Sequence, residues 1–149
     1  MPIGLSPRTV PQKSANKTVT HNPGDGIGPK SNNTYIHHCI VANNNCDHVK
    51  LWGTGSSVEN TLIYGRGDGN PAHGLGTIVI ETEPNARFTI TNVAVDDALG
   101  GNYLMTANYP HPERPIKLNV INTIFSGIGK SSTLFLGSGV SFTFRNNLS

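Results

Sequence analysis

The sequence predicts an all-β fold, a parallel β-helix (solenoid) of about five coils, and three observations support this. The 149 residues include 17 glycines and 10 prolines, which are costly in helix interiors and common in turns. Apolar residues alternate with polar ones in recurring short segments, which is the pattern of strands with one buried face. These segments repeat every 22 to 32 residues, measured between central positions 38, 60, 92, 122 and 146. Units this short must stack on one another to bury their apolar faces.

One strand of each coil is predicted from segments with alternating apolar residues around a central polar residue. These segments are residues 34–41, 56–63, 88–95, 118–125 and 142–149. An apolar column stands two residues before the centre and contains Ile36, Val58, Ile90, Val120 and Phe144. A second apolar column stands two residues after it and contains Ile40, Leu62, Ala94, Ile124 and Leu148. Because residues two apart in a strand share a face, we expect both columns on the buried face.

The central polar positions form a column of their own, made of His38, Asn60, Asn92, Asn122 and Asn146. A side-chain amide can donate to the amide of one neighbouring coil and accept from the other. We therefore expect an internal asparagine ladder, with His38 at its first rung.

A second strand is predicted once in each coil. Its segments are residues 25–30, 47–53, 76–81, 103–108 and 132–137. Their inward positions are expected to be Ile27, Val49, Leu51, Ile78, Ile80, Leu134 and Leu136. Matching columns in successive coils imply parallel strands about 4.8 Å apart.

The run from Gly24 to Gly69, together with the asparagine column, resembles the repeats of pectate-lyase-like proteins. The resemblance covers approximately residues 22–149 and implies a right-handed parallel β-helix. That superfamily contains lyases, glycoside hydrolases, epimerases, phage tailspikes and non-enzymatic surface proteins. The resemblance therefore favours a fold and leaves the activity open.

The chain is expected to consist of two parts, one irregular and one regular. Residues 1–21 contain Pro2, Pro7 and Pro11 without clear alternation, and we expect an irregular arm or cap there. Residues 22–149 are expected to form the β-helix. The repeat stops at Ser149, so we expect a β-helix truncated at this end or covered by another chain, with head-to-tail assembly as one route.

The candidate binding site lies on the outward face of the second strand set. With Val49 and Leu51 inward, His48, Lys50 and Trp52 are expected to face outward, and neighbouring coils should bring Lys30 and Glu81 close to Trp52. An exposed tryptophan beside polar groups suits stacking on a sugar ring. The alternative is that Trp52 packs beneath the loop formed by residues 65–76.

That loop carries Arg66, Asp68 and His73 on a glycine-rich segment. In the lyases that the fold resembles, a Lys or Arg removes the C5 proton while a cation neutralises the uronate. The resemblance thus implies Lys50 as the base, Arg66 as its helper and His48 beside them. We expect no cofactor, with calcium as the weaker alternative. A calcium site would need a cage of carboxylates, and Asp47, Asp68 and Glu81 form no evident one.

Composition excludes several partner classes. The net charge is +2 without a basic cluster, so no nucleic-acid partner is expected. No apolar stretch approaches the roughly 18 residues of a membrane span, and no signal peptide stands at the start.

Cys39 and Cys46 are too far apart for a CxxC pair, which leaves two thiols or a disulfide. The neighbours His37 and His38 are expected on opposite faces, so no shared metal is expected.

Three functions remain open. The first is an extracellular or cell-surface module that acts as a structural or carbohydrate-contacting platform. The second is part of a polysaccharide lyase or another carbohydrate-active enzyme. The third is a solenoid that self-assembles into head-to-tail fibres or another homo-oligomer.

Overall fold

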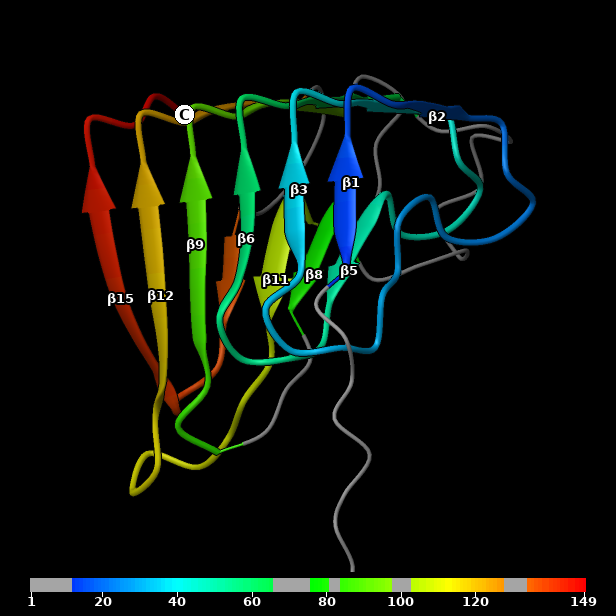
Figure 1. The fold of residues 1–149 in the computed structure, drawn as a ribbon. Helices are drawn as coiled ribbons and strands as arrows, with labels where there is room; N and C mark the ends of the chain where they lie inside the picture. Colours follow the sequence, from blue (N-terminus) through cyan, green and yellow to red (C-terminus); the bar gives the residue numbers. More distant parts are fainter. Residues whose placement is uncertain (1–11, 66–75, 81–83, 98–102, 128–133) are drawn as a thin grey trace, which may run out of the picture.

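The structure, a computed structural model, describes residues 12–65, 76–80, 84–97, 103–127 and 134–149, and within these ranges it contains fifteen strands and no helix. Successive coils contribute one strand each to three parallel sheets, called A, B and C here (Figure 1). Sheet A contains, in spatial order, β1 (Lys13–Ala15), β3 (Tyr35–His37), β6 (Ser56–Glu59), β9 (Arg87–Thr91), β12 (Ile116–Ile121) and β15 (Val140–Arg145).

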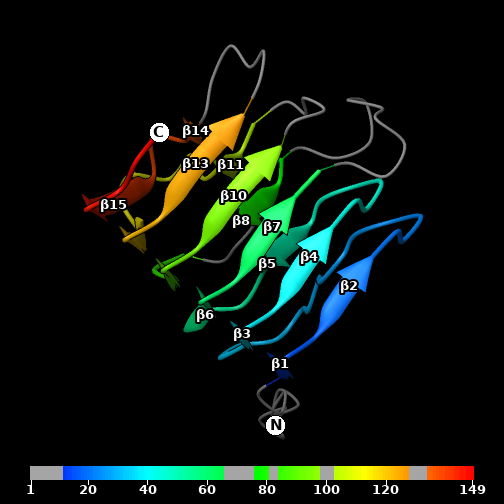
Figure 2. The same cartoon turned by 90° about the horizontal axis from the view of Figure 1, so that it is seen from above.

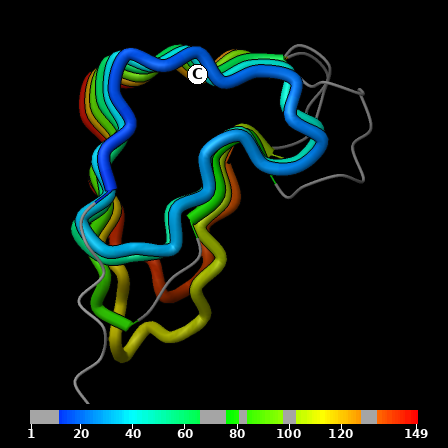
Figure 3. The backbone as a smooth tube through the Cα atoms, turned by 45° about the vertical axis from the view of Figure 1, so that its right-hand side comes forward, coloured from blue at the N-terminus to red at the C-terminus, as the bar shows by residue number. Residues whose placement is uncertain are grey.

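The other two sheets close the coil. Figure 2 shows sheet B, which contains β2 (Thr18–Thr20), β4 (Ile40–Ala42), β7 (Leu62–Tyr64), β10 (Ala94–Asp97) and β13 (Ile124–Gly127). Sheet C contains β5 (Val49–Leu51), β8 (Ile78–Ile80), β11 (Met105–Ala107) and β14 (Leu134–Leu136). Viewed along the stack, the strands of successive coils superpose, whereas the connection that leads into sheet A extends further in the later coils (Figure 3). The predicted all-β parallel solenoid is confirmed.

The core is formed by columns of apolar side chains that point inward from the three sheets. In sheet A, Ile36, Val58, Ile90 and Val120 are paired in register and are all fully buried. In sheet C, Val49 is paired with Ile78 and Leu51 with Ile80, and all four are buried. Both inward columns agree with the sequence prediction.

Each coil turns at bends whose central residues have left-handed backbone conformations. Between sheets A and B this residue is Asn16, His38, Asn60, Asn92, Asn122 or Asn146, with φ between 47° and 54°. Asparagine tolerates this conformation better than most residues because its short polar side chain bonds locally. The bend after sheet B uses His21, Asn43 and Gly65, and the bend before sheet A uses Asn33, Gly55 and Asn85.

The second predicted apolar column faces outward, which corrects the prediction. Ile40, Leu62 and Ile124 are 40%, 40% and 48% exposed, whereas the following residues Val41 and Ile63 are fully buried. The inward positions of one coil are 36, 39 and 41. The left-handed residue between the two strands shifts the inward and outward alternation by one residue. The alternation of the first strand therefore does not continue into the second.

The polar column is also exposed, so the prediction of an internal ladder is wrong in its placement. Its side chains still form a line of hydrogen bonds on the outside of the bend. The Asn122 amide nitrogen donates to Asn92 Oδ1 (3.2 Å), and the Asn92 nitrogen donates to Asn60 Oδ1 (3.1 Å). Asn44 is fully buried inside the solenoid, and its amide nitrogen donates to the Val19 carbonyl.

The solenoid begins earlier than residue 22. Strands β1 and β2 lie within the segment predicted as an irregular arm, and they pair in parallel with β3 and β4. Residues 1–11 lie outside the described part of the chain. Within that part, no helix is long and apolar enough to cross a membrane.

Candidate functional site

Trp52 and two lysines form a cluster at the end of β5. Lys50 points away from the core between Val49 and Leu51, and Trp52 follows the strand and is half-buried. The Lys30 ammonium lies 5.0 Å from the centre of the Trp52 ring, and the Lys50 ammonium lies 5.5 Å from it. Both distances are within the range of cation–π attraction. Lys30 therefore approaches Trp52 as the sequence predicted.

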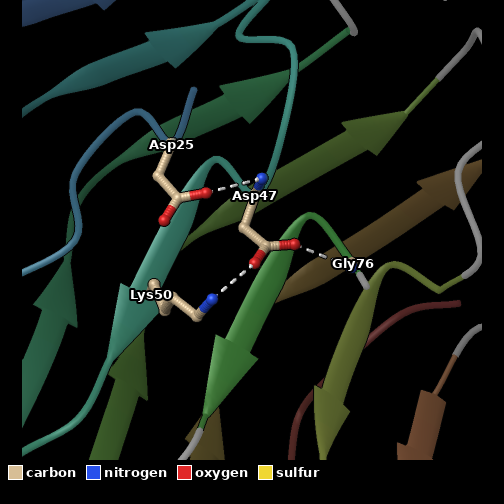
Figure 4. Close-up of polar contacts among 4 residues, drawn as sticks. All are labelled: Asp25, Asp47, Lys50 and Gly76. Carbon is tan, nitrogen blue, oxygen red and sulfur yellow. Dashed lines mark hydrogen bonds and ion pairs between the residues drawn. The ribbon is translucent and has the colours of Figure 1, made fainter. Parts of the chain in front are cut away.

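A buried carboxylate, that of Asp47, contacts Lys50 of this cluster (Figure 4). Asp47 has a side chain only 3% exposed, and its Oδ2 lies 3.2 Å from Lys50 Nζ. Its Oδ1 accepts a hydrogen bond from the Gly76 backbone nitrogen at 3.2 Å, which joins this coil to the next. The Asp47 backbone nitrogen in turn donates to Asp25 Oδ1 at 3.3 Å. Asp47 thus holds both the lysine and the neighbouring backbone.

His48 is buried, which corrects the prediction that it faces outward. It has no exposed surface, and its Nε2 lies 3.0 Å from the Tyr64 carbonyl oxygen. A carbonyl can only accept, so Nε2 donates. His48 precedes β5 and lies outside the alternation of that strand, and a ring buried in this way cannot contact a polysaccharide.

Less of the outward face of sheet C is exposed than the sequence analysis implied. Val79 pairs with Lys50 as expected, but Val79 and Thr106 on the following strands are only 1% and 4% exposed. The exposed outward positions of this face therefore lie at its two ends: at β5 with the preceding coil, and at Phe135 of β14, which is paired with Thr106 and 39% exposed. The predicted site residues Arg66, Asp68, His73 and Glu81 lie outside the described residues.

A second polar cluster, which the sequence analysis did not identify, lies on the outward face of sheet A. The Tyr35 hydroxyl donates to Glu59 Oε2, and this hydrogen bond raises the pKa of Tyr35 above its usual 10.0. The Tyr35 ring stacks on His37 with centroids 4.2 Å apart. Burial, the Lys13 ammonium and His38 lower the pKa of His37 below 6.5, and the Glu59 carboxylate acts against them.

The imidazoles of His37 and His38 meet instead of pointing to opposite faces. Their Nδ1 atoms are 2.9 Å apart, because the left-handed backbone at His38 returns its side chain toward the strand. Within the described ranges, no group of three or more His, Cys, Asp or Glu side chains is arranged to hold a metal.

Cys39 and Cys46 are not bonded to each other. Cys39 is buried, and its Sγ donates to the His37 and Ser14 carbonyl oxygens at 3.2 and 3.4 Å. The spacing left either two thiols or a disulfide open. Cys39 is a thiol, and its hydrogen bonds give it a structural role.

Comparisons with known proteins add no assignment to this geometry. No protein-family model, no curated protein and no solved structure matches the chain.

Proposed function

We propose that the chain is an extracellular or cell-surface β-solenoid module that acts as a structural platform and contacts carbohydrate through Trp52. The observation that carries this proposal is the half-buried Trp52 ring with the Lys30 and Lys50 ammonium groups 5.0 and 5.5 Å from its centre. A sugar ring has an apolar face that packs on an aromatic ring and polar edges that bond to neighbouring donors. The resemblance to pectate-lyase-like proteins supports the same class of ligand.

The arrangement of Lys50 supports binding better than general-base catalysis. A general base must accept a proton from the substrate, but Lys50 Nζ is held in an ion pair with the buried Asp47 carboxylate at 3.2 Å. His48, the other described residue of the lyase hypothesis, is buried against the Tyr64 carbonyl. Carbohydrate binding therefore explains the arrangement of this site better than lyase activity does.

Trp52 is the only tryptophan of the chain, so its fluorescence reports directly on the site. We expect a saturable fluorescence change when oligogalacturonates or neutral β-glucan oligosaccharides are added. Trp52→Ala should weaken binding at least about tenfold in calorimetry, equivalent to about 1.4 kcal/mol. Lys30→Ala should weaken the binding of the acidic oligosaccharide more than that of the neutral one.

Lys117→Ala is the matched control, because Lys117 is an exposed lysine on the outward face of β12. It should leave binding unchanged. Absence of binding to both sugars, or equal binding by Trp52→Ala, would contradict the proposal. New ultraviolet absorbance from unsaturated sugar ends in the same mixtures would favour the lyase hypothesis.

Self-assembly is a second candidate, favoured by the outermost strand of sheet A. Phe142 of β15 is paired with the fully buried Leu118 and belongs to an inward column, yet it is 54% exposed. The adjacent Phe144 packs against it with ring centroids 5.2 Å apart. A strand from a second copy, stacked on β15, would cover both rings.

Light scattering over a hundredfold range of concentration tests this candidate. We expect the mass of the wild-type particles to increase with concentration and Phe142→Lys to remain monomeric, because the new charge would be buried between copies. Ser141→Lys adds the same charge at the neighbouring exposed position and should still assemble. A wild-type monomer at every concentration would eliminate this function.

A further inference from the structure

His37 of β3 and His38 of the following bend lie at one end of a line of hydrogen bonds in which every asparagine amide donates in the same direction. Amide nitrogens donate from Asn122 to Asn92 and from Asn92 to Asn60. The next contact joins Asn60 Nδ2 to His38 Nε2 at 3.4 Å, and the last joins the Nδ1 atoms of His38 and His37 at 2.9 Å. The first three donors are amides, which cannot accept at nitrogen.

This direction determines where each imidazole carries its proton. Because Asn60 Nδ2 can only donate, His38 Nε2 must accept and therefore has no proton. The proton of a neutral His38 is then on Nδ1, from which it is donated to Nδ1 of His37. His37 keeps its own proton on Nε2, a buried atom without a hydrogen-bond partner among the described residues.

A further proton cannot be added to either ring without breaking a contact. Protonation of His37 at Nδ1 would place two N–H groups against each other, and protonation of His38 at Nε2 would do the same with Asn60. The charged groups that face the pair are Lys13 on β1 and Glu59 on β6, with the Tyr35 hydroxyl bound to Glu59. Lys13 disfavours a positive imidazole, and Glu59 only partly offsets this.

We propose that Asn60, His38 and His37 form a proton-sensitive clasp between the coils of β3 and β6, closed when both imidazoles are neutral and open when either is protonated. The clasp goes beyond the carbohydrate-binding function and does not depend on it. The geometry agrees in sign with the lowered pKa of His37: the folded state binds fewer protons than the unfolded state as pH falls through 6.5. The clasp thus contributes stability above that pH and loses it in acid.

Long-range proton–nitrogen NMR of the imidazoles tests the assignment directly. At pH 8 we expect the His38 proton on Nδ1 and the His37 proton on Nε2. On acidification the signals of the two rings should change together, because protonation of either ring opens the clasp. A His38 proton on Nε2 at pH 8 would overturn the proposal.

Asn60→Asp offers a sharper test, because aspartate also tolerates the left-handed backbone but cannot donate. His38 should then donate from Nε2 to the introduced carboxylate, and the proton between the rings should come from His37. Opening should move to lower pH, since His38 can now be protonated without losing the contact to position 60.

Asn122→Asp makes the same change at an equivalent bend two rungs away, where φ is 50° against 47° at Asn60. It should leave both histidine tautomers as in the wild type. Unchanged tautomers in Asn60→Asp would contradict the clasp, and if that variant does not fold, the wild-type tautomers alone decide.

Discussion

Replacing Ile63 by alanine should lower the free energy of unfolding by about 2–5 kcal/mol, whereas Leu62→Ala should cost less than about 1 kcal/mol. The two residues are neighbours in β7, with similar side-chain volumes. Ile63 is fully buried in the core, and Leu62 is 40% exposed on the outward face of sheet B. The difference between the variants therefore measures which way this strand faces.

Denaturant unfolding followed by circular dichroism provides the measurement, with the slopes compared as well as the midpoints. Val41→Ala and Ile40→Ala repeat the comparison one coil earlier, with Val41 buried and Ile40 40% exposed. If Leu62→Ala and Ile40→Ala were the more damaging pair, Leu62 and Ile40 would face the core, as the alternation in the sequence predicted, and the outward orientation of these two side chains would be contradicted.

Strand alternation was predictable from the sequence, but the conformation of the residue between two strands was not. Periodicity identifies which residues share a face within one strand, and Ile36, Val58 and Ile90 are buried as expected. Periodicity does not show by how many residues a bend shifts the alternation between one strand and the next. The asparagine column itself contained the missing signal, because asparagine at one position of every repeat is typical of a left-handed residue.

The sequence predicted the contacts of the candidate site that follow from the register between stacked coils. It did not predict the orientation of side chains at the bends. Lys30 lies over Trp52 because stacked coils bring the same relative positions together. His48 and His38 lie at the ends of strands, where alternation gives no orientation, and both were placed on the wrong face. The Tyr35–Glu59 hydrogen bond could have been found, since both residues occupy outward positions on paired strands.

Asp47→Ala should be the most damaging substitution at the candidate site, with a loss of about 2–4 kcal/mol in unfolding free energy. The variant would leave the Gly76 backbone N–H without its buried acceptor and the Lys50 ammonium without its carboxylate. Since Lys50 is 18% exposed, water reaches the ammonium, and the lost acceptor dominates the cost. Loosening of the link between the coils should also weaken carbohydrate binding, because Lys50 is held near Trp52 through this carboxylate.

Asp47→Asn separates the two contributions, because the amide oxygen can still accept from Gly76 while the charge is lost. We expect it to cost about 1 kcal/mol or less, the value of an ion pair whose lysine is reached by water. Both variants are measured by chemical unfolding, with Asp25→Asn as a control for the exposed carboxylate that accepts from the Asp47 backbone. Equal losses for Asp47→Ala and Asp47→Asn would show that the charge of Asp47, and not its hydrogen bond to Gly76 of the next coil, accounts for the stabilisation. A negligible loss for Asp47→Ala would contradict the structural role of this carboxylate.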